Sequence, residues 1–403
     1  MSQASESNRQ ELDPLPLEAP VAPPVDAPPE RPAHRRADAP DVTAEVDRLI
    51  ASVGGQPGSF QAKLIRDAVS TCLKLIPDGR DTGELKLITS ALKELRYAYR
   101  VFSQFPDPHK VTIFGSARTP ADHPDYAAAV TFSRLMGEAG WMVITGAGGG
   151  IMEAGHVGPG RARSFGVAIR LPFETTANDV ILGDEKLIYF RYFFTRKLMF
   201  LSQAEAVALF PGGFGTMDEA YEVLTLVQTG KASMIPIVCC EGRPANAKGP
   251  TYWEAFDDWV RSQLLTRRWI SAEDLSLYHI APTPEDAASH IARFYRNYHS
   301  SRYVNDDFVI RMKKPLKQAD VDRLSEEFGV LIKPAGEASG RPFTPPGGEP
   351  APVLRSTGRI VQRGPYAAEQ DHLDLPRLAF THTRRGYGRI RQLIDRINEL
   401  ETA

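Results

Sequence analysis

The segment PGGFGTMDE, residues 211–219, combines residue types that bind an anion with a carboxylate that can take part in catalysis. Glycine has no Cβ, so its backbone N–H can come close to an anion. An apolar run at 206–210 precedes the segment and a helical pattern at 218–228 follows it. This order indicates a strand, a turn and a helix N-terminus, and the last of these attracts negative charge. The candidate phosphate ligands are the backbone N–H groups of Gly212, Gly213, Gly215 and Thr216.

Two further turns have the same form. An apolar run at 141–145 leads into a glycine-rich turn, and another at 111–114 leads into Gly115 and Ser116. The carboxyl ends of parallel strands form the ligand-binding edge of doubly wound sheets, so one phosphorylated small molecule could contact all three turns. Neither a Walker loop nor an intact Gly-x-Gly-x-x-Gly fingerprint is present, which argues against an ATPase and a dehydrogenase. The candidates from these two turns are Ser116, Gly146, Gly148, Gly149 and Gly150.

Charged residues flank the first turn. Arg196 and Lys197 lie in a helical pattern at 191–203, where two cations are often only the solvated edge of an amphipathic face. Thr216 and Glu219 have the spacing of a capping box, in which Glu219 would only bond the helix backbone. Spacing alone leaves the structural and the catalytic interpretation of Glu219 open. His156, after the second glycine turn, is expected to be a structural histidine.

These motifs together resemble the LOG (LONELY GUY) family, formerly named lysine decarboxylases. Its signature is Pro-Gly-Gly-x-Gly-Thr-x-x-Glu, preceded by an Arg-Lys pair on the previous helix. Residues 211–219 match the signature in full, and Arg196 with Lys197 matches the pair at the family's separation. The second glycine turn departs from the pattern at Ala147 and Gly149, where many members have Gly and Pro. The resemblance covers roughly residues 108–300.

The resemblance implies a phosphoribohydrolase that cleaves the N-glycosidic bond of a nucleoside 5′-monophosphate, a purine or cytokinin ribotide, to free base and ribose 5-phosphate. It implies neither a cofactor nor a metal. Glu219 would stabilise an oxocarbenium-like state and orient water, and we expect the helix N-terminus to favour its ionised form. Arg196 would hold the substrate, and Lys197 would contact phosphate or cover a surface.

Two other functions remain as alternatives. A nucleotide or molybdenum-cofactor carrier of the same fold would bind its ligand without turnover. A decarboxylase would need a lysine placed for a pyridoxal Schiff base, and Lys197 beside a phosphate pocket offers no such environment.

Strand and helix patterns alternate along the middle of the chain, which predicts an α/β fold with a doubly wound, Rossmann-like parallel sheet. We expect strands at 111–115, 141–145, 165–171, 206–210, 234–240 and 277–281, with helices at 125–139, from 150, and at 191–203, 217–229, 252–265 and 284–299. The expected domains are a disordered Pro/Ala-rich tail at 1–41, a helical segment at 42–107, the nucleotide-binding domain at 108–300 and a small C-terminal α+β extension at 301–403.

The two flanking regions have their own patterns. Helices are expected at 60–76 and 84–102, the second opened by a capping box of Asp81 and Glu84. The C-terminal extension predicts a βαβ-like unit, a Pro/Gly linker and a last strand and helix. These elements are expected at 307–312, 319–328 and 330–333, at 334–350 for the linker, and at 375–381 and 389–400.

Composition narrows the possible partners. The 403 residues have a formal net charge of −2, which gives no general attraction for nucleic acid or an anionic membrane. The absence of a membrane-spanning apolar run and of a signal-peptide pattern predicts a cytoplasmic protein. Cys72, Cys239 and Cys240 lack metal-ligand spacing, so reduced, inert thiols are expected. The resemblance adds a nucleoside monophosphate substrate and a homodimer or larger homo-oligomer as expected partners.

Overall fold

A computed structural model describes residues 36–107, 109–170, 177–243, 248–336, 355–367 and 369–402. Most of the tail expected at 1–41 and of the linker expected at 334–350 lies outside these ranges. The chain forms two compact units, Met1–Ile88 and Thr89–Ala403, and each is described separately.

The first unit is helical. It contains α1 (Pro40–Ser52), α2 (Phe60–Lys74) and the start of α3 (Thr82–Phe102), and Val46, Ile50 and Ala62 form its small apolar core. The expected capping box of α3 is confirmed, because the backbone N–H of Glu84 donates to Asp81 Oδ1 at 2.9 Å and that of Asp81 donates to Glu84 Oε2 at 3.3 Å. The sequence interpretation missed α1.

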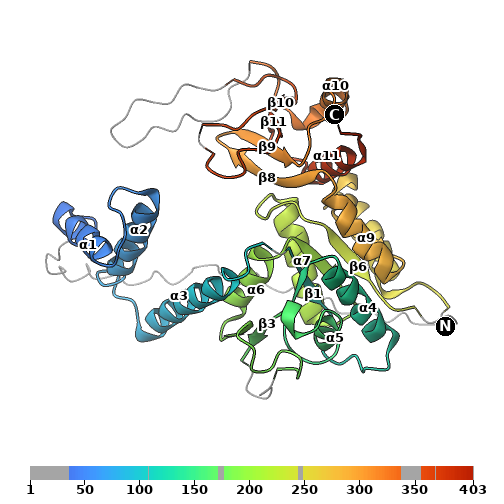
Figure 1. Cartoon of the computed structure of the whole chain (residues 1–403), viewed down its shortest axis with the longest axis horizontal. Coiled ribbons are helices and arrows are strands. Elements are labelled where there is room, and N and C mark those ends of the chain that lie inside the picture. The colour runs from blue at the N-terminus through green and yellow to red at the C-terminus, as the bar shows by residue number, and fades with distance from the viewer. Residues whose placement is uncertain are drawn as a thin grey trace, which may run out of the picture. The chain divides into compact units, whose positions relative to one another are not determined.

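The second unit is built on a parallel sheet, to which β1, β3 and β6 in Figure 1 belong. Its seven strands have the order β4-β3-β2-β1-β5-β6-β7. The chain winds outward from β1 to β4 on one side and from β5 to β7 on the other, so β1 and β5 are neighbours at the point where the order reverses. This topology confirms the doubly wound α/β fold. The strands are β1 (Lys110–Phe114), β2 (Met142–Thr145), β3 (Ser164–Ile169), β4 (Leu187–Phe190), β5 (Ala206–Leu209), β6 (Ile237–Cys240) and β7 (Tyr278–Ala281).

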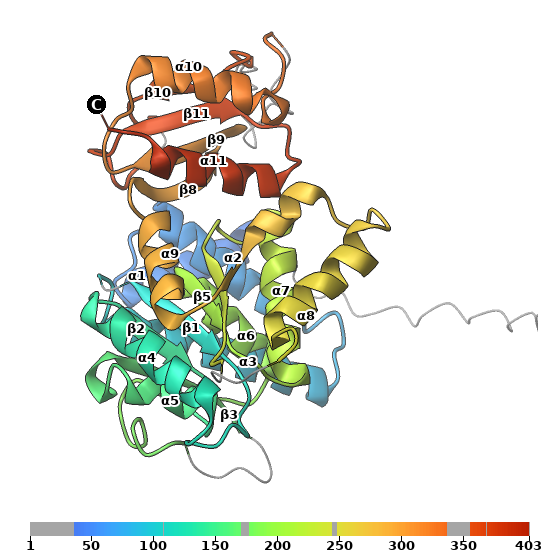
Figure 2. The same cartoon turned by 90° about the vertical axis from the view of Figure 1, so that its right-hand side faces the viewer.

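Helices cover both faces of this sheet. On one face lie α4 (Pro124–Glu138), α5 (Ile151–Val157) and α9 (Pro284–Phe294) (Figure 2). The second half of α3 and α6 (Phe193–Ser202) cover the other face, where Phe102 of α3 stacks on Phe165 of β3 with ring centroids 4.5 Å apart.

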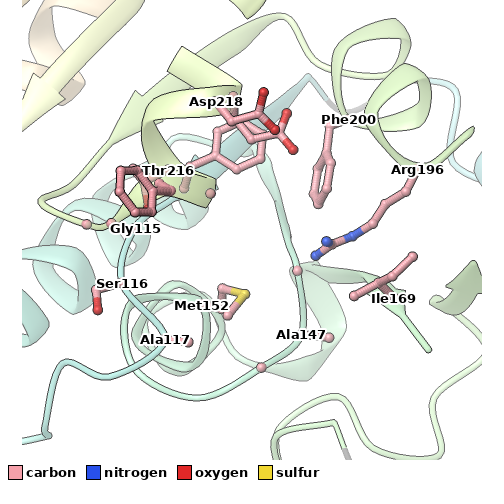
Figure 3. Close-up of a pocket in the computed structure, with 18 of the residues that line it drawn as sticks. Gly115, Ser116, Ala117, Ala147, Met152, Ile169, Arg196, Phe200, Thr216 and Asp218 are labelled. Atoms are coloured by element: carbon pink, nitrogen blue, oxygen red, sulfur yellow. The ribbon is translucent and has the colours of Figure 1, made fainter. Parts of the chain in front are cut away.

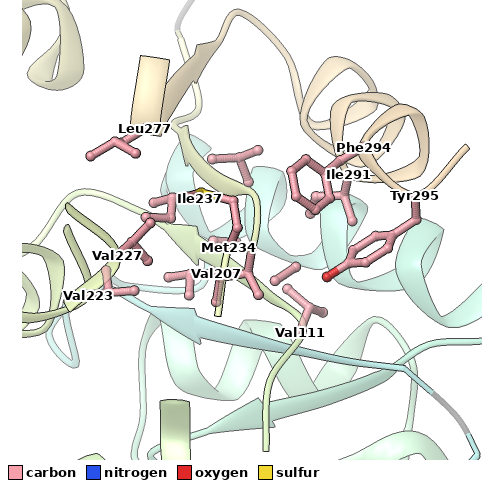
Figure 4. Packing of buried hydrophobic residues seen from close by; sticks show 14 of the residues in the cluster. Val111, Val207, Val223, Val227, Met234, Ile237, Leu277, Ile291, Phe294 and Tyr295 are labelled. Carbon is pink, nitrogen blue, oxygen red and sulfur yellow. The ribbon is translucent and has the colours of Figure 1, made fainter. Parts of the chain in front are cut away.

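The central strands are apolar on both faces. Val207 and Ile237 lie between Val227 of α7 (Phe214–Gln228) and Phe294 of α9 (Figure 4). Cys239 and Cys240 are buried on β6, and burial raises the pKa of the Cys240 thiol to about 12, which keeps the thiol protonated as expected. After β6 follow α8 (Tyr252–Trp259), a π-helical turn (Val260–Leu265) and the 3₁₀ helix η3 (Ala272–Leu277). No helix in the described ranges is long and apolar enough to cross a membrane.

A separate antiparallel sheet with the order β10-β11-β9-β8 forms the C-terminal part of this unit. Its strands are β8 (Tyr298–Val304), β9 (Asp307–Met312), β10 (Val361–Arg363) and β11 (Arg377–Thr381), and its helices are α10 (Gln318–Glu327) and α11 (Tyr387–Glu399). The small α+β extension is confirmed, but the βαβ-like unit is wrong. Residues 329–331 form a 3₁₀ turn where a strand was expected to begin, and β9 pairs with β8, whose first two residues were expected to end a helix.

Candidate active site

A cavity of about 1190 Å³ opens at the carboxyl ends of β1 and β5, where doubly wound sheets bind ligands (Figure 3). The turns after β1, β2 and β5 all contribute to its wall, together with α6 and α7. The three turns therefore meet as the sequence indicated. The candidate residues that line the cavity are Ser116, Gly146, Gly148, Arg196, Gly212, Gly213, Gly215, Thr216 and Glu219.

Backbone hydrogen bonds join the three turns into one unit. The N–H of Ser116 donates to the carbonyl of Pro211 at 3.1 Å, and the N–H of Ile151 donates to the carbonyl of Ser116 at 3.0 Å. Gly212 must be a glycine here, because a Cβ at this position would lie 2.1 Å from Thr216 Oγ1. The close approach of the turns fixes the shape of the cavity wall.

The N-terminus of α7 forms one side of the cavity. The helix begins at Phe214, and its N-cap residue Gly213 offers no side chain to bond the first N–H groups. The first hydrogen bond within the helix runs from the N–H of Met217 to the carbonyl of Gly213, which leaves the N–H groups of residues 214–216 without helical partners. Space is open where a Cβ would stand on Gly213 and on Gly215. An anion fits this position by charge and by access.

Glu219 lies one turn further along α7. Because the N-cap is Gly213, Thr216 and Glu219 do not form a capping box. Glu219 is only 8% exposed, and its Oε2 has no hydrogen-bond partner among the described residues. Burial raises its pKa to about 7, although the charges of Lys197 and Arg196 act in the opposite direction. The cost of removing this charge from water therefore outweighs the helix N-terminus, which was expected to favour the ionised form.

Arg196 extends from α6 into the same cavity (Figure 3). Its Nε donates to the carbonyl of Val167 on β3 at 2.8 Å, and its guanidinium lies 5.1 Å from the ring centroid of Phe200. These contacts fix the direction of the side chain. Its charge lowers the pKa of Glu219, so the two expected catalytic groups lie close enough to interact.

Three of the candidates lie outside the cavity wall. Lys197 Nζ is 2.8 Å from Asp218 Oδ2 and 2.7 Å from Glu222 Oε2, so this cation pairs with two acids of α7. Gly150 has a φ of +62° and packs against the carbonyl of Ser116, and Gly149 lies beside it in the same turn. The two glycines shape the turn, and they do not reach the cavity.

His156 is a buried structural residue, as expected. Its Nε2 lies 3.0 Å from the carbonyl of Phe165, which can only accept, so Nε2 carries the proton and Nδ1 accepts from Asn178 Nδ2 at 3.2 Å. Burial lowers the pKa of His156, which keeps the ring neutral. The Asn178 amide also donates to the carbonyl of Gly148 at 3.0 Å, so this network supports the second glycine turn.

Sequence reasoning missed several residues of the cavity wall. Arg118 follows Ser116 by two positions, and its place in a loop at the ligand-binding edge was a usable signal. Tyr252 of α8 donates its hydroxyl to the carbonyl of Gly212 at 2.8 Å, but it is 40 positions away in the chain. The remaining missed residues with long side chains are Phe114, Met152, Ile169, Arg170, Tyr189, Phe193, Phe200, Phe214, Met217 and Asp218.

Fold and cavity together define an α/β protein with a crevice at the switch point of a doubly wound sheet. Residues 149–291 match the protein family described as "Possible lysine decarboxylase". This match confirms the resemblance to the LOG family, which formerly had that name. None of the curated proteins matches the chain.

Several solved structures are similar at low identity. The molybdenum cofactor carrier protein from Chlamydomonas reinhardtii is 16% identical over 46% of this chain and 97% of its own, with a TM-score of 0.32. The molybdenum cofactor binding protein from Rippkaea orientalis is 20% identical over 47% of this chain and 97% of its own, with a TM-score of 0.31. DNA processing protein A from Helicobacter pylori is 9% identical over 46% of this chain and 81% of its own, with a TM-score of 0.28. Similarities this low do not bear on function.

Proposed function

We propose that this protein hydrolyses the N-glycosidic bond of a nucleoside 5′-monophosphate and releases free base and ribose 5-phosphate. One observation carries the proposal. The buried Glu219 carboxyl, with an oxygen that has no partner among the described residues, lines the same cavity as Arg196 and the N-terminus of α7. A carboxylate, a directional cation and an anion-binding helix end are the groups that this reaction needs.

Each group has a separate task in the proposed reaction. The phosphate binds at the N-terminus of α7, which leaves the sugar beside Glu219. As the bond between C1′ and the base nitrogen breaks, positive charge grows on the sugar, and the ionised carboxylate stabilises it. Water then adds its oxygen to C1′ and gives up a proton, while the departing base gains one. Arg196 donates to the base as negative charge develops on it.

The pKa of Glu219 supports catalysis over carriage. A carboxyl with a pKa of about 7 can take and return a proton at neutral pH, which is the property of a general acid or base. A carrier has no need of such a group, because binding does not require proton exchange. A carrier of nucleotide or molybdenum cofactor remains the alternative, and turnover distinguishes the two.

A decarboxylase that uses pyridoxal phosphate finds no support in the cavity. Its chemistry needs a lysine for the Schiff base, and the described residues of the cavity wall include none. We expect the purified protein to lack pyridoxal absorbance and to release no carbon dioxide from lysine.

A base-release panel tests the proposed function. Wild type, Glu219→Gln and the control Glu138→Gln, which changes an exposed acid on α4, are incubated with AMP, GMP, IMP, CMP and a cytokinin ribotide. We expect wild type and the control to release free base at equal rates, and Glu219→Gln to lose about 100-fold or more in kcat. Equal turnover in Glu219→Gln would contradict the mechanism. Tight binding of every nucleotide without base release by wild type would favour the carrier.

We further infer that the protein forms a homodimer or a larger homo-oligomer. Leu92 and Tyr99 of α3 and Phe194 and Leu198 of α6 are exposed apolar side chains, and the two helices are neighbours through a 2.6 Å hydrogen bond from Thr195 Oγ1 to Glu94. Exposed apolar side chains on neighbouring helices favour association. Sedimentation velocity of wild type and Leu198→Glu tests this inference, and a monomeric wild type at micromolar concentration would contradict it.

A further inference from the structure

We propose that Arg118 is the cation that binds the phosphate group of the ligand in the cavity at the N-terminus of α7. The proposal rests on the proposed function for the identity of the ligand as a nucleoside monophosphate. It assigns a binding residue that lies outside both the glycine signature and the Arg196–Lys197 pair.

The backbone places Arg118 beside the anion-binding helix end. Its N–H donates to Ser116 Oγ at 3.1 Å, and Ser116 is bonded in turn to Pro211, directly before the glycines that open α7. Arg118 lines the cavity, its residue is exposed, and its guanidinium makes no ion pair or hydrogen bond with any described residue. The donors of this guanidinium are therefore available to a ligand.

The charge of a phosphate monoester requires such a cation. The group carries nearly two negative charges at neutral pH, whereas a helix N-terminus supplies roughly half a positive charge. Lys197 cannot supply the rest, because it pairs with Asp218 and Glu222 and does not line the cavity. Without a further cation, the phosphate would bind with much of its charge uncompensated.

Arg196 approaches the cavity from a different part of the sheet than Arg118, so it is not placed to bind the phosphate group. It is bonded to β3, whereas Arg118 follows β1, and β2 lies between these strands. Neighbouring strands are about 4.8 Å apart, so the two arginines approach the cavity from points about 10 Å apart. A mononucleotide of extended shape can therefore meet Arg118 with its phosphate while its sugar and base lie toward Arg196.

A guanidinium suits this task because its fork of donors can bond two phosphate oxygens at once. The consequence is selectivity for phosphorylated ligands. Loss of Arg118 should weaken the binding of phosphate esters and leave the binding of an unphosphorylated nucleoside unchanged.

Titration calorimetry with inorganic phosphate, AMP and adenosine tests the proposal. It measures binding, and a separate assay for free base shows whether AMP is hydrolysed during the titration. The variants are Arg118→Ala, Arg118→Lys and Arg163→Ala. The last removes another exposed arginine, which lies outside the cavity and has no side-chain ion pair or hydrogen bond among the described residues. We expect Arg118→Ala to bind AMP and inorganic phosphate about 10- to 100-fold more weakly, with adenosine unaffected. Arg118→Lys should recover part of the loss, and Arg163→Ala should match wild type.

The outcomes separate this proposal from the proposed function. Wild type that binds AMP in an Arg118-dependent way but releases no base would overturn the hydrolase and support the role of Arg118. Wild-type affinity for AMP and phosphate in Arg118→Ala would overturn the role of Arg118 and leave the hydrolase standing. An equal loss of adenosine and AMP binding would show that Arg118 only supports the loop, which also contradicts the proposal. Failure of wild type to bind either phosphate compound would overturn both.

Discussion

At the scale of single residues, the behaviour of Glu219 depends on the balance between burial and nearby charge. Its residue is 8% exposed, and the two cations near it do not fully compensate for the loss of water. The result is a pKa raised to about 7, so that the carboxyl is half protonated at neutral pH. Enzymes commonly tune a catalytic acid or base in this way.

The raised pKa predicts how activity depends on pH. Because the proposed mechanism uses the ionised carboxylate, kcat/KM should rise about tenfold per pH unit below pH 7 and level off above it. The second ionisation of the substrate phosphate falls near pH 6, so an inflection at about 7 identifies the enzyme group. Initial rates measured from pH 5 to 9 provide the test. A flat profile across pH 7 would show that Glu219 does not control the reaction in this form.

Lys197 has a different role from the one that the motif suggested. Its Nζ pairs with Asp218 and Glu222, and its charge lowers the pKa of Glu219. We expect Lys197→Met to move the inflection of the pH profile to higher pH and to lower the free energy of unfolding by about 1–3 kcal/mol, since the acids lose their counter-charge. Lys197→Arg, which keeps the charge, is the control.

The two roles of Lys197 can be told apart by binding. A phosphate contact would show as weaker binding of inorganic phosphate in Lys197→Met at fixed pH. We expect that affinity to stay close to the wild-type value, because Lys197 does not line the cavity and its side chain is engaged with Asp218 and Glu222.

At the scale of elements, two glycines of the turn between β5 and α7 have different surroundings: Gly212 is closely packed, and Gly215 faces open space. A Cβ on Gly212 would lie 2.1 Å from Thr216 Oγ1 and 2.9 Å from the backbone nitrogen of Ser116, so Gly212→Ala must push the turns apart. A Cβ on Gly215 would meet nothing within 4 Å, and alanine is the better helix former.

This contrast gives a paired prediction. Gly212→Ala should lower the melting temperature and abolish nucleotide binding, because the joined turns are disrupted. Gly215→Ala should leave the free energy of unfolding unchanged or raise it by up to about 1 kcal/mol, yet weaken phosphate binding by filling the space that the ligand uses. Thermal melts and calorimetry on both variants measure the two effects. Unchanged phosphate affinity in Gly215→Ala would place the anion elsewhere.

The sequence predicted the central elements because local signals agreed with the fold. The strands before the three turns are buried on both faces and are followed within three residues by a glycine, so their positions and their common edge could be inferred. It missed β4, a four-residue strand at the sheet edge whose Tyr189 is exposed. It also missed β8, although Asn305 with a φ of +55° forms a two-residue hairpin turn with Asp306 before β9.

Residues of the site could be predicted from the sequence only where they belong to a motif within one segment. Arg196 and Glu219 could be named because they stand in motifs, whereas Tyr252 reaches Gly212 only through the pairing of distant strands. The pKa of Glu219 could not be predicted, since it depends on burial by several elements and on Lys197 one helix away. The spacing of motifs shows which charged residues belong to the site. The packing of several elements around them sets their pKa values, and this packing is not visible in the sequence.

At the scale of the whole second unit, the C-terminal extension is packed onto α7, which lines the site, and onto α9. Tyr387 of α11 stands against Gly230 at the end of α7, where a Cβ would lie 2.1 Å from its ring. Ile390 and Ile394 of α11 belong to the same apolar core as the parallel sheet, and α11 also packs on η3. We therefore expect the extension and the parallel sheet to unfold together.

A buried ion triad in the extension allows this expectation to be tested. Glu369 accepts from Arg311 Nη2 at 2.6 Å and from Arg377 Nε at 2.8 Å, and these three side chains are at most 4% exposed. Burial acts to raise the pKa of Glu369, but the hydrogen bonds from Arg377, the Tyr366 backbone and Arg311 outweigh it and lower that pKa to about 2. A depressed carboxyl pKa adds stability that is complete above the unfolded value near 4.5 and is lost as the pH falls towards 2.

Glu369→Gln should therefore lower the free energy of unfolding by about 3–5 kcal/mol at pH 7, because the buried Arg377 loses its counter-charge and Arg311 keeps only Asp371, and by less at pH 3. All four tryptophans, at 141, 253, 259 and 269, belong to the part of the chain before the extension. If the unit unfolds as a whole, urea titrations followed by tryptophan fluorescence and by far-UV circular dichroism will show one shared midpoint that moves to lower urea. The control Glu401→Gln changes an exposed acid that pairs with Lys317, and it should leave the urea midpoint unchanged. A fluorescence midpoint that stays fixed while circular dichroism changes early would show that the extension unfolds alone.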